Sequence, residues 1–263
     1  MRIDLHNHTP LCQHATGTPE EYIQKAIALG IDVYGFSCHA PMAFDTKYRM
    51  SLAQLPEYFE TLQSLRQSYK TRIDIRIGLE VDFIKGKENL IESQVRNAQV
   101  DYLIGSVHFL NNWGFDNPEF IGHYKHTDMT QCWSDYLDSI TAMAQSGLFQ
   151  IIGHFDLLKV FNNPPPHALH HKLKTTLESI KDNACALEIN SAGLRKPCAE
   201  QYPSRHILEM AKDMQIPITF SSDAHSLEQV GAGYEICKNL ALELGYTHMC
   251  AFKDKQIETF ALT

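Results

Sequence analysis

The sequence predicts an α/β protein whose parallel strands form a closed or nearly closed barrel. About seven short apolar segments alternate with amphipathic segments in one uninterrupted series, which is typical of parallel strands joined by helices. The chain has 263 residues, close to the length at which α/β barrels form one domain. It contains none of the glycine-rich motifs with which doubly wound sheets hold nucleotides.

Each expected strand is a short apolar run that ends where polar residues begin. The run Ile73–Leu79, for example, is rich in β-branched residues, which favour strands. The expected strands are Arg2–Leu5, Val33–Ser37, Ile73–Leu79, Tyr102–Val107, Phe149–Ile152, Ala186–Ile189 and Ile216–Phe220, with a further short strand near Met249–Phe252.

The expected helices carry apolar residues at helical spacing, and some have recognisable ends. Thr18 is followed by Pro19 and Glu21, the pattern of a capped helix start, and Gly30 follows the end of the same segment. The expected helices are Thr18–Leu29, Leu55–Tyr69, Asn89–Asn97, Thr130–Ser146, His167–Asn183, Ser204–Met214 and Leu227–Leu244.

Composition and charge restrict the class of protein. No linker or low-complexity tract divides the chain, so we expect one domain over residues 1–263. The net charge of −8 argues against a nucleic-acid partner, and no apolar run approaches the roughly 20 residues of a membrane span. The first ten residues lack the apolar segment of an export signal, and the seven cysteines form no C-x-x-C pair. We therefore expect a cytoplasmic protein with reduced thiols, and the sequence predicts no oligomeric state.

Histidine or a carboxylate follows almost every expected strand. Because the carboxyl ends of all strands meet on one face of a parallel barrel, these side chains should converge. Imidazoles grouped around carboxylates are typical ligands of divalent transition metals. The candidate metal ligands are His6, His8, His14, His39, Glu80, His108, His154, Asp223 and His225.

Local spacing supports the metal interpretation. His6 and His8 are separated by one residue at a strand end, so both rings leave on the same side, and Asp223 and His225 repeat this spacing. Glu80 has two oxygens and could bridge two ions. A single histidine after a strand is usually a hydrogen-bonded core residue, but the joint pattern favours two or three ions. Zn, Fe and Mn all accept such ligands.

The motifs at these positions resemble those of the PHP (polymerase and histidinol phosphatase) superfamily. They are D-x-H-N-H at 4–8, C-Q-H at 12–14, C-H-A-P at 38–41, G-x-E at 78–80, S-V-H at 106–108, G-H-F-D at 153–156 and S-D-A-H at 222–225. Four further stretches resemble the histidinol-phosphatase branch, at 47–50, 108–116, 188–196 and 202–204. Cys38 departs from the acid that relatives often carry, and Phe155 departs from a common proline.

The resemblance implies a distorted (β/α)7 barrel with a trinuclear metal centre. It implies a first ion held by His6, His8, Glu80 and Asp223, a second by Glu80, His108 and His154, and a third by His14, His39 and His225. The implied reaction is hydrolysis of L-histidinol phosphate to L-histidinol and phosphate, a step of histidine biosynthesis, by a hydroxide that bridges the first two ions. The alternative is a PHP-type phosphoesterase that acts on another small phosphate ester, a nucleotide or phosphotyrosine.

Three further roles are expected around such a centre. Asp223 would orient the nucleophile or accept its proton, and His225 would help to protonate the leaving alkoxide if it is transiently free of metal. Arg195 is the first candidate for phosphate recognition, although it could instead pair with Glu200.

Two more cations and one carboxylate complete the candidate residues. Lys159 and Arg49 are further candidates for binding the phosphate, with a solvated cation as an equal alternative. Asp4 is expected either to accept the outer N–H of a ligand imidazole or to be a solvated or capping carboxylate. An amidohydrolase and a non-catalytic metal-binding protein are the rival classes.

Overall fold

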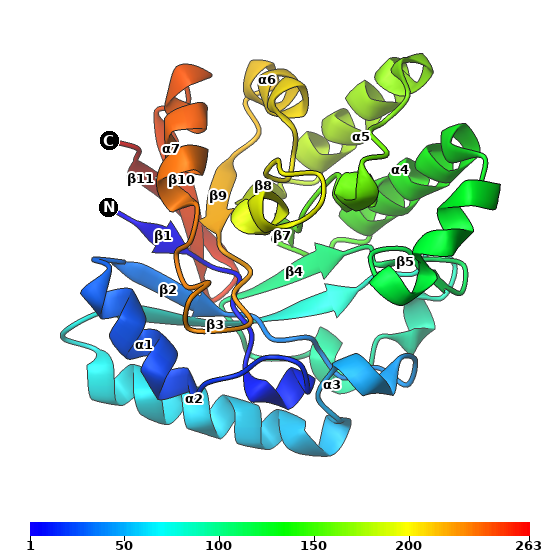
Figure 1. Cartoon of the computed structure of the whole chain (residues 1–263). Coiled ribbons are helices and arrows are strands. Elements are labelled where there is room, and N and C mark those ends of the chain that lie inside the picture. Colours follow the sequence, from blue (N-terminus) through cyan, green and yellow to red (C-terminus); the bar gives the residue numbers. More distant parts are fainter.

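Seven parallel strands surround the centre of the computed structural model, which describes all 263 residues (Figure 1). They are β1 (Ile3–Asp4), β2 (Val33–Phe36), β3 (Asp74–Asp82), β4 (Tyr102–Ser106), β7 (Ile151–Ile152), β8 (Ala186–Asn190) and β9 (Ile218–Ser221). Neighbours in the sheet follow this chain order. The backbone N–H of Leu5 donates to the carbonyl of Phe220 at 3.0 Å, which joins the first strand to the last. The predicted (β/α)7 barrel is therefore confirmed.

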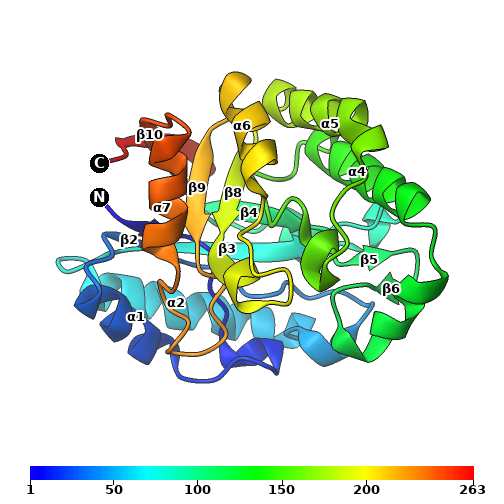
Figure 2. The same ribbon diagram turned by 45° about the horizontal axis from the view of Figure 1, so that its top comes forward.

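Helices form a layer outside the strands (Figure 2). They are α1 (Pro19–Ala28), α2 (Leu55–Tyr69), α3 (Ser93–Arg96), α4 (Met129–Gln145), α5 (His170–Asp182), α6 (Arg205–Asp213) and α7 (Tyr234–Glu243). The predicted start of α1 is confirmed, because Thr18 N–H donates to Glu21 at 2.7 Å and the Thr18 hydroxyl accepts from Glu21 N–H. None of the helices combines the length and the apolar composition that a membrane crossing requires.

Two of the expected helices were wrong in extent. The predicted helix Asn89–Asn97 is reduced to a 3-10 turn at Glu88–Leu90 and the single turn of α3. The helix predicted from Leu227 begins only at Tyr234, because Gly231 and Gly233 adopt left-handed φ angles of 64° and 76° that interrupt a right-handed helix. The short strand expected near 249–252 is confirmed, and it lies outside the seven-stranded barrel.

That last segment is one arm of an antiparallel hairpin formed by β10 (His248–Lys253) and β11 (Gln256–Ala261). Arg76, near the start of β3, donates to the carbonyl of Phe252 at 2.8 Å. Asp101, just before β4, accepts from Asp254 N–H. The hairpin therefore covers the amino-terminal end of the barrel and leaves the opposite end to the polar residues. A second hairpin that was not predicted, β5 (Phe109–Leu110) with β6 (Trp113–Gly114), follows β4.

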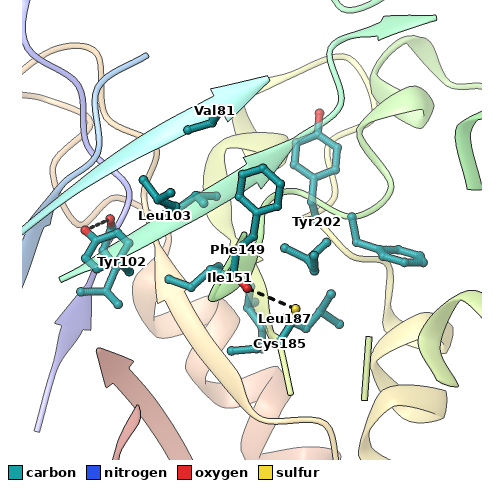
Figure 3. Close-up of a cluster of buried hydrophobic side chains, with 14 of the residues drawn as sticks. Val81, Tyr102, Leu103, Phe149, Ile151, Cys185, Leu187 and Tyr202 are labelled. Carbon is teal, nitrogen blue, oxygen red and sulfur yellow. Dashed lines mark hydrogen bonds between the residues drawn. The ribbon is translucent and has the colours of Figure 1, made fainter. Parts of the chain in front are cut away.

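Close packing of large side chains fixes the strands relative to one another. Figure 3 shows buried residues of β4, β7 and β8 in one cluster, among them Leu103, Ile151 and Leu187. The Tyr102 hydroxyl donates to the Leu5 carbonyl at 2.6 Å and so links β4 to the end of β1. A Cβ at Gly78 would come 2.5 Å from the Tyr102 ring, so this position requires glycine. The strand ends are held rigidly by this packing.

Candidate metal centre

The nine candidate ligands come together at the carboxyl-terminal ends of the strands. Most follow β1, β2, β4, β7 and β9 directly, while Glu80 lies within β3 and His14 in the loop before α1. Seven of the nine line one cavity of about 690 Å³. The other two, His6 and His8, are fully buried beneath it. Residues separated by more than 200 positions in the sequence therefore form one polar site, as the barrel topology requires.

Glu80 lies at the centre of this site. Its Oε2 is 2.8 Å from His39 Nδ1 and 3.3 Å from His6 Nε2. Its Oε1 is 3.0 Å from His154 Nε2 and 3.5 Å from His108 Nε2. The two oxygens thus face two different sets of imidazoles, which is the arrangement that a carboxylate bridging two cations needs.

Asp223 is the second carboxylate among the candidate ligands. It follows β9 in the left-handed region with a φ of 52°, a conformation that costs a non-glycine residue energy and recurs at functional sites. Its Oδ1 lies 3.2 Å from His8 Nε2 and 3.9 Å from His6 Nε2. Asn190 donates to its Oδ2 at 3.1 Å. The strained backbone therefore directs this carboxylate toward the two histidines that follow β1.

The donor atoms are spaced closely enough to hold ions. Five sets have ligand atoms that all lie within 4.8 Å of one another. Three consist of candidate ligands alone: His6 with His8 and Glu80, Glu80 with His108 and His154, and His8 with His39 and His225. The other two include cysteine: Cys12 with His14 and His225, and Cys12 with Cys38 and His8. The His14 ring lies 4.7 Å from that of His225, centroid to centroid. His6 Nε2 and Glu80 Oε2 are buried without a hydrogen-bond partner. Since buried polar atoms are rarely left unpaired, these residues fit bound cations.

The charges of the candidate ligands suit bound cations. Burial opposes ionisation of Glu80, yet the surrounding imidazoles, chiefly His6 and His39, hold its pKa well below the usual range. The pKa of Asp223 is also held well below its usual range against burial, chiefly by His6. Burial lowers the pKa of His108, but the carboxylates of Asp82 and Glu80 raise it to about 10. Divalent cations would replace the protons that these imidazoles share with the carboxylates.

Two buried carboxylates that the sequence analysis did not single out orient the candidate ligands. Glu188, on β8, lies 2.7 Å from His6 Nδ1 and accepts from His154 N–H at 2.6 Å. Asp82, on β3, lies 2.6 Å from His108 Nδ1. An acidic residue inside an otherwise apolar strand is the signal that could have found both, because such a residue needs a buried partner.

Of the two alternatives expected for Asp4, the structure shows neither a contact with a ligand imidazole nor a solvated carboxylate, because the side chain is buried. Its carboxylate accepts from the backbone N–H of Ser222 at 2.9 Å, the Ser222 hydroxyl at 2.6 Å and the Asn7 side chain at 3.0 Å. Asp4 therefore ties β1 to the end of β9, and Glu188 and Asp82 make the contacts expected of it.

Of the three candidate phosphate-binding cations, Arg195 is the one best placed to bind a ligand in the cavity. It is exposed, lines the cavity, and donates from Nη2 to the Ser222 carbonyl at 2.7 Å. Its Nε and Nη1 make no hydrogen bond within the protein, and the alternative pairing with Glu200 is not formed.

The other two cations are buried and engaged within the protein. Lys159 Nζ lies 3.0 Å from Asp156 and 2.7 Å from Glu200, and it does not line the cavity. Arg49 lines the cavity, but it donates to Asp82 at 2.8 Å and to Asp45 at 3.2 Å. Their positions do not favour the predicted direct contact with phosphate.

Sequence comparison places the chain in a known class of proteins. The profile of the PHP domain matches residues 4–192, and that of the PHP-associated family matches residues 204–239. The chain therefore belongs to the PHP family, as its motifs indicated.

Individual relatives indicate which members of the PHP family this chain is similar to. A Deinococcus radiodurans protein named "Probable histidinol-phosphatase" is 44% identical over 233 residues, which cover 87% of this chain and 88% of that protein. The histidinol-phosphatase of Bacillus subtilis is 30% identical, with 89% and 97% covered. The fold matches histidinol phosphate phosphatase from Lactococcus lactis, solved with zinc, L-histidinol and phosphate, with a TM-score of 0.85 at 24% identity over 98% of each chain.

Proposed function

We propose that this chain hydrolyses L-histidinol phosphate to L-histidinol and inorganic phosphate, as a phosphoric monoester hydrolase of histidine biosynthesis. The observation that carries the proposal is Glu80, whose two oxygens face four imidazole nitrogens at 2.8 to 3.5 Å. A carboxylate in this position suits a multinuclear site for phosphoryl chemistry. Two relatives that cover 87% and 89% of the chain carry histidinol-phosphatase names, which supports the choice of substrate.

Two to three divalent transition ions, Zn, Fe or Mn, would complete the site. The first ion would be held by His6, His8, Glu80 and Asp223, and the second by Glu80, His108 and His154. The third would be held by His14, His39 and His225, whose ring centroids lie 4.7 to 6.1 Å apart. The chemistry that such ions supply when bound is activation of a water and neutralisation of phosphoryl charge. The Lactococcus lactis relative was solved with zinc, which favours that metal.

Asp223 would accept a proton from the attacking water. Its pKa is held well below the usual range, so the carboxylate is ionised at neutral pH, and Asn190 fixes one of its oxygens. His225 is a weaker candidate for the proton donor to the leaving alkoxide. Burial and the neighbouring His8 hold the pKa of His225 well below its usual range, so it lacks the proton a general acid needs. We therefore assign His225 to metal binding.

The cavity offers complementary charges to a substrate with a phosphate at one end and an amine at the other. Arg195 presents unpaired guanidinium N–H groups to a phosphate. Asp116 and Glu119 line the same cavity and would attract the amine. Arg49 would act indirectly, since it holds the Asp82 carboxylate that orients His108.

The cysteines support a reducing, cytoplasmic location. All seven are free thiols in the structure, and six of them are buried. Disulfides are rare in reduced compartments, so this pattern agrees with the expected location.

The alternative within the family is hydrolysis of another small phosphate ester, a nucleotide or phosphotyrosine. A phosphate-release screen on protein with measured metal content separates these possibilities. We expect kcat/KM for histidinol phosphate to exceed that for nucleotides and phosphotyrosine by at least a hundredfold. A preference for either of the other two classes would contradict the assignment, and metal binding without turnover of any ester would favour a non-catalytic protein.

A further inference from the structure

Two cysteines from different loops meet behind the metal centre. Cys12 lies in the loop after β1 and Cys38 directly follows Ser37 at the end of β2, and both are fully buried. The backbone of Thr9 holds them together: its carbonyl accepts from Cys12 N–H at 3.1 Å, and both its N–H and its carbonyl lie 3.5 Å from Cys38 Sγ.

The pair also contacts a candidate metal ligand. A ring nitrogen of His8 and the sulfurs of Cys12 and Cys38 all lie within 4.8 Å of one another. The Nδ1 of His8 is buried without a hydrogen-bond partner, while its Nε2 faces Asp223 at 3.2 Å. The function proposed above uses neither thiol, so this cluster calls for its own explanation.

We propose that Cys12 and Cys38 form an oxidation site at which a peroxide converts the two thiols into a disulfide. One sulfur attacks hydrogen peroxide, the O–O bond breaks, and a sulfenic acid and one water result. The second sulfur then attacks the sulfenic sulfur, the S–S bond forms, and the hydroxyl leaves as a second water with the remaining thiol proton. The two sulfurs lose two electrons in total and the peroxide gains them.

The loop that carries Cys12 reaches the surface next to the buried pair. Cys12 is followed directly by Gln13 and His14, which are both exposed, so a small movement of this loop would admit a peroxide. The other buried cysteines offer no such pair near the site. Cys250, for example, lies in β10 at the opposite end of the barrel.

Disulfide formation would disturb the candidate ligands on both loops. A disulfide requires a sulfur–sulfur distance of about 2.05 Å and defined torsion angles, which the loops reach only by moving toward each other. His14 is two residues from Cys12, and His39 is adjacent to Cys38. Oxidation should therefore shift both histidines and weaken the hold on the ion that we assign to them.

The test uses the metal-loaded full-length protein, treated with hydrogen peroxide and alkylated without reduction. Peptide mapping by mass spectrometry should find Cys12 linked to Cys38, and elemental analysis should show the loss of about one metal ion per chain. Phosphatase activity should fall at least tenfold and return after treatment with dithiothreitol and metal. The mapping needs no phosphatase assay, so its result stands even if the proposed substrate is wrong.

Two variants and a control complete the design. Cys38→Ser and Cys12→Ser, each normalised to its own untreated rate, should resist peroxide, whereas Cys250→Ser should respond as the wild type does. If the wild-type map shows Cys12 and Cys38 unlinked after full loss of activity, the proposal is wrong. It is also wrong if Cys38→Ser or Cys12→Ser is inactivated as fast as the wild type, since oxidation would then act elsewhere.

Discussion

The carboxylate of Glu188 and the imidazole of His6 are both fully buried, and Glu188 Oε1 lies 2.7 Å from His6 Nδ1. With Nδ1 bound to Glu188, His6 presents Nε2 to Glu80 and Asp223. Glu188 also accepts from Ser221 and from the N–H of His154, so one side chain contacts two candidate ligands that follow the separate strands β1 and β7. Such outer partners fix the tautomer and direction of metal-binding histidines.

Replacing Glu188 with glutamine should therefore weaken metal binding. Glutamine keeps the shape but has one acceptor oxygen and introduces an N–H₂ that faces donors. We expect metal affinity to fall about 10–100-fold, measured by competition with a chromogenic chelator. Glu178→Gln, on the exposed side of α5, is the matched control and should bind as the wild type does. Unchanged affinity in Glu188→Gln would mean that the contact does not support the metal site.

Replacing Glu80 with glutamine should impair the metal centre more than replacing Glu188 does, because Glu80 contacts both groups of imidazoles directly. The substitution removes a charge and one of two ligand oxygens, so we expect at least a hundredfold loss of turnover, about 3 kcal/mol or more. Elemental analysis should show fewer than the two to three ions expected of the wild type. A Glu80→Gln variant with near-normal rate and metal content would show that Glu80 is not a metal ligand. Glu57→Gln, at an exposed position, serves as the control.

Arg195→Ala tests phosphate recognition. A charge-assisted hydrogen bond contributes roughly 1.5–3 kcal/mol, so kcat/KM for histidinol phosphate should fall about 10–150-fold with metal content unchanged. Arg195→Lys should recover only part of this loss, because an ammonium lacks the planar fork of the guanidinium. Lys181→Ala, at an exposed cation in the last turn of α5 that does not line the cavity, is the control. Wild-type kinetics in Arg195→Ala would mean that phosphate is held without this side chain.

Lys159→Met should act on stability and leave substrate binding unchanged. Its ammonium compensates the buried carboxylate of Asp156, so its removal leaves an unpaired buried charge that costs about 3 kcal/mol or more. Chemical denaturation should show this loss, with KM close to that of the wild type. An increase in KM without loss of stability would restore Lys159 as a phosphate ligand.

The stability of metal-free protein should fall as the solution becomes alkaline. Burial opposes protonation of His8 and His108, but nearby carboxylates raise their pKa values from 6.5 to about 9 and about 10. Groups with a raised folded-state pKa stabilise the fold fully below pH 6.5, and this stabilisation is lost as pH rises through 9 and 10.

Chelated and metal-loaded protein should therefore differ in their pH profiles. Melting temperature measured from pH 6.5 to 10 should decline in the chelated protein, while bound metal, having displaced these protons, should flatten the profile and raise the melting temperature. A chelated protein that becomes more stable between pH 7 and pH 9 would contradict the charge states described for the site.

The barrel and the candidate ligands could be predicted from the sequence, because both depend on local and periodic features. Strand and helix alternation is encoded in short apolar runs and capping residues such as Thr18 and Glu21. The sequence also shows directly that His39 and His108 come just after strands. Because the carboxyl ends of all strands in a parallel barrel lie on one face, residues in such positions must converge there.

The partners of individual side chains, by contrast, could be identified only in the folded chain. Whether Lys159 meets a phosphate or the carboxylate of Asp156, and whether Asp4 or Glu188 supports His6, depends on which loops pack together across the barrel. The pairing of Cys12 with Cys38 has the same origin. Such contacts join residues far apart in sequence, and no local pattern contains the distance and orientation that create them.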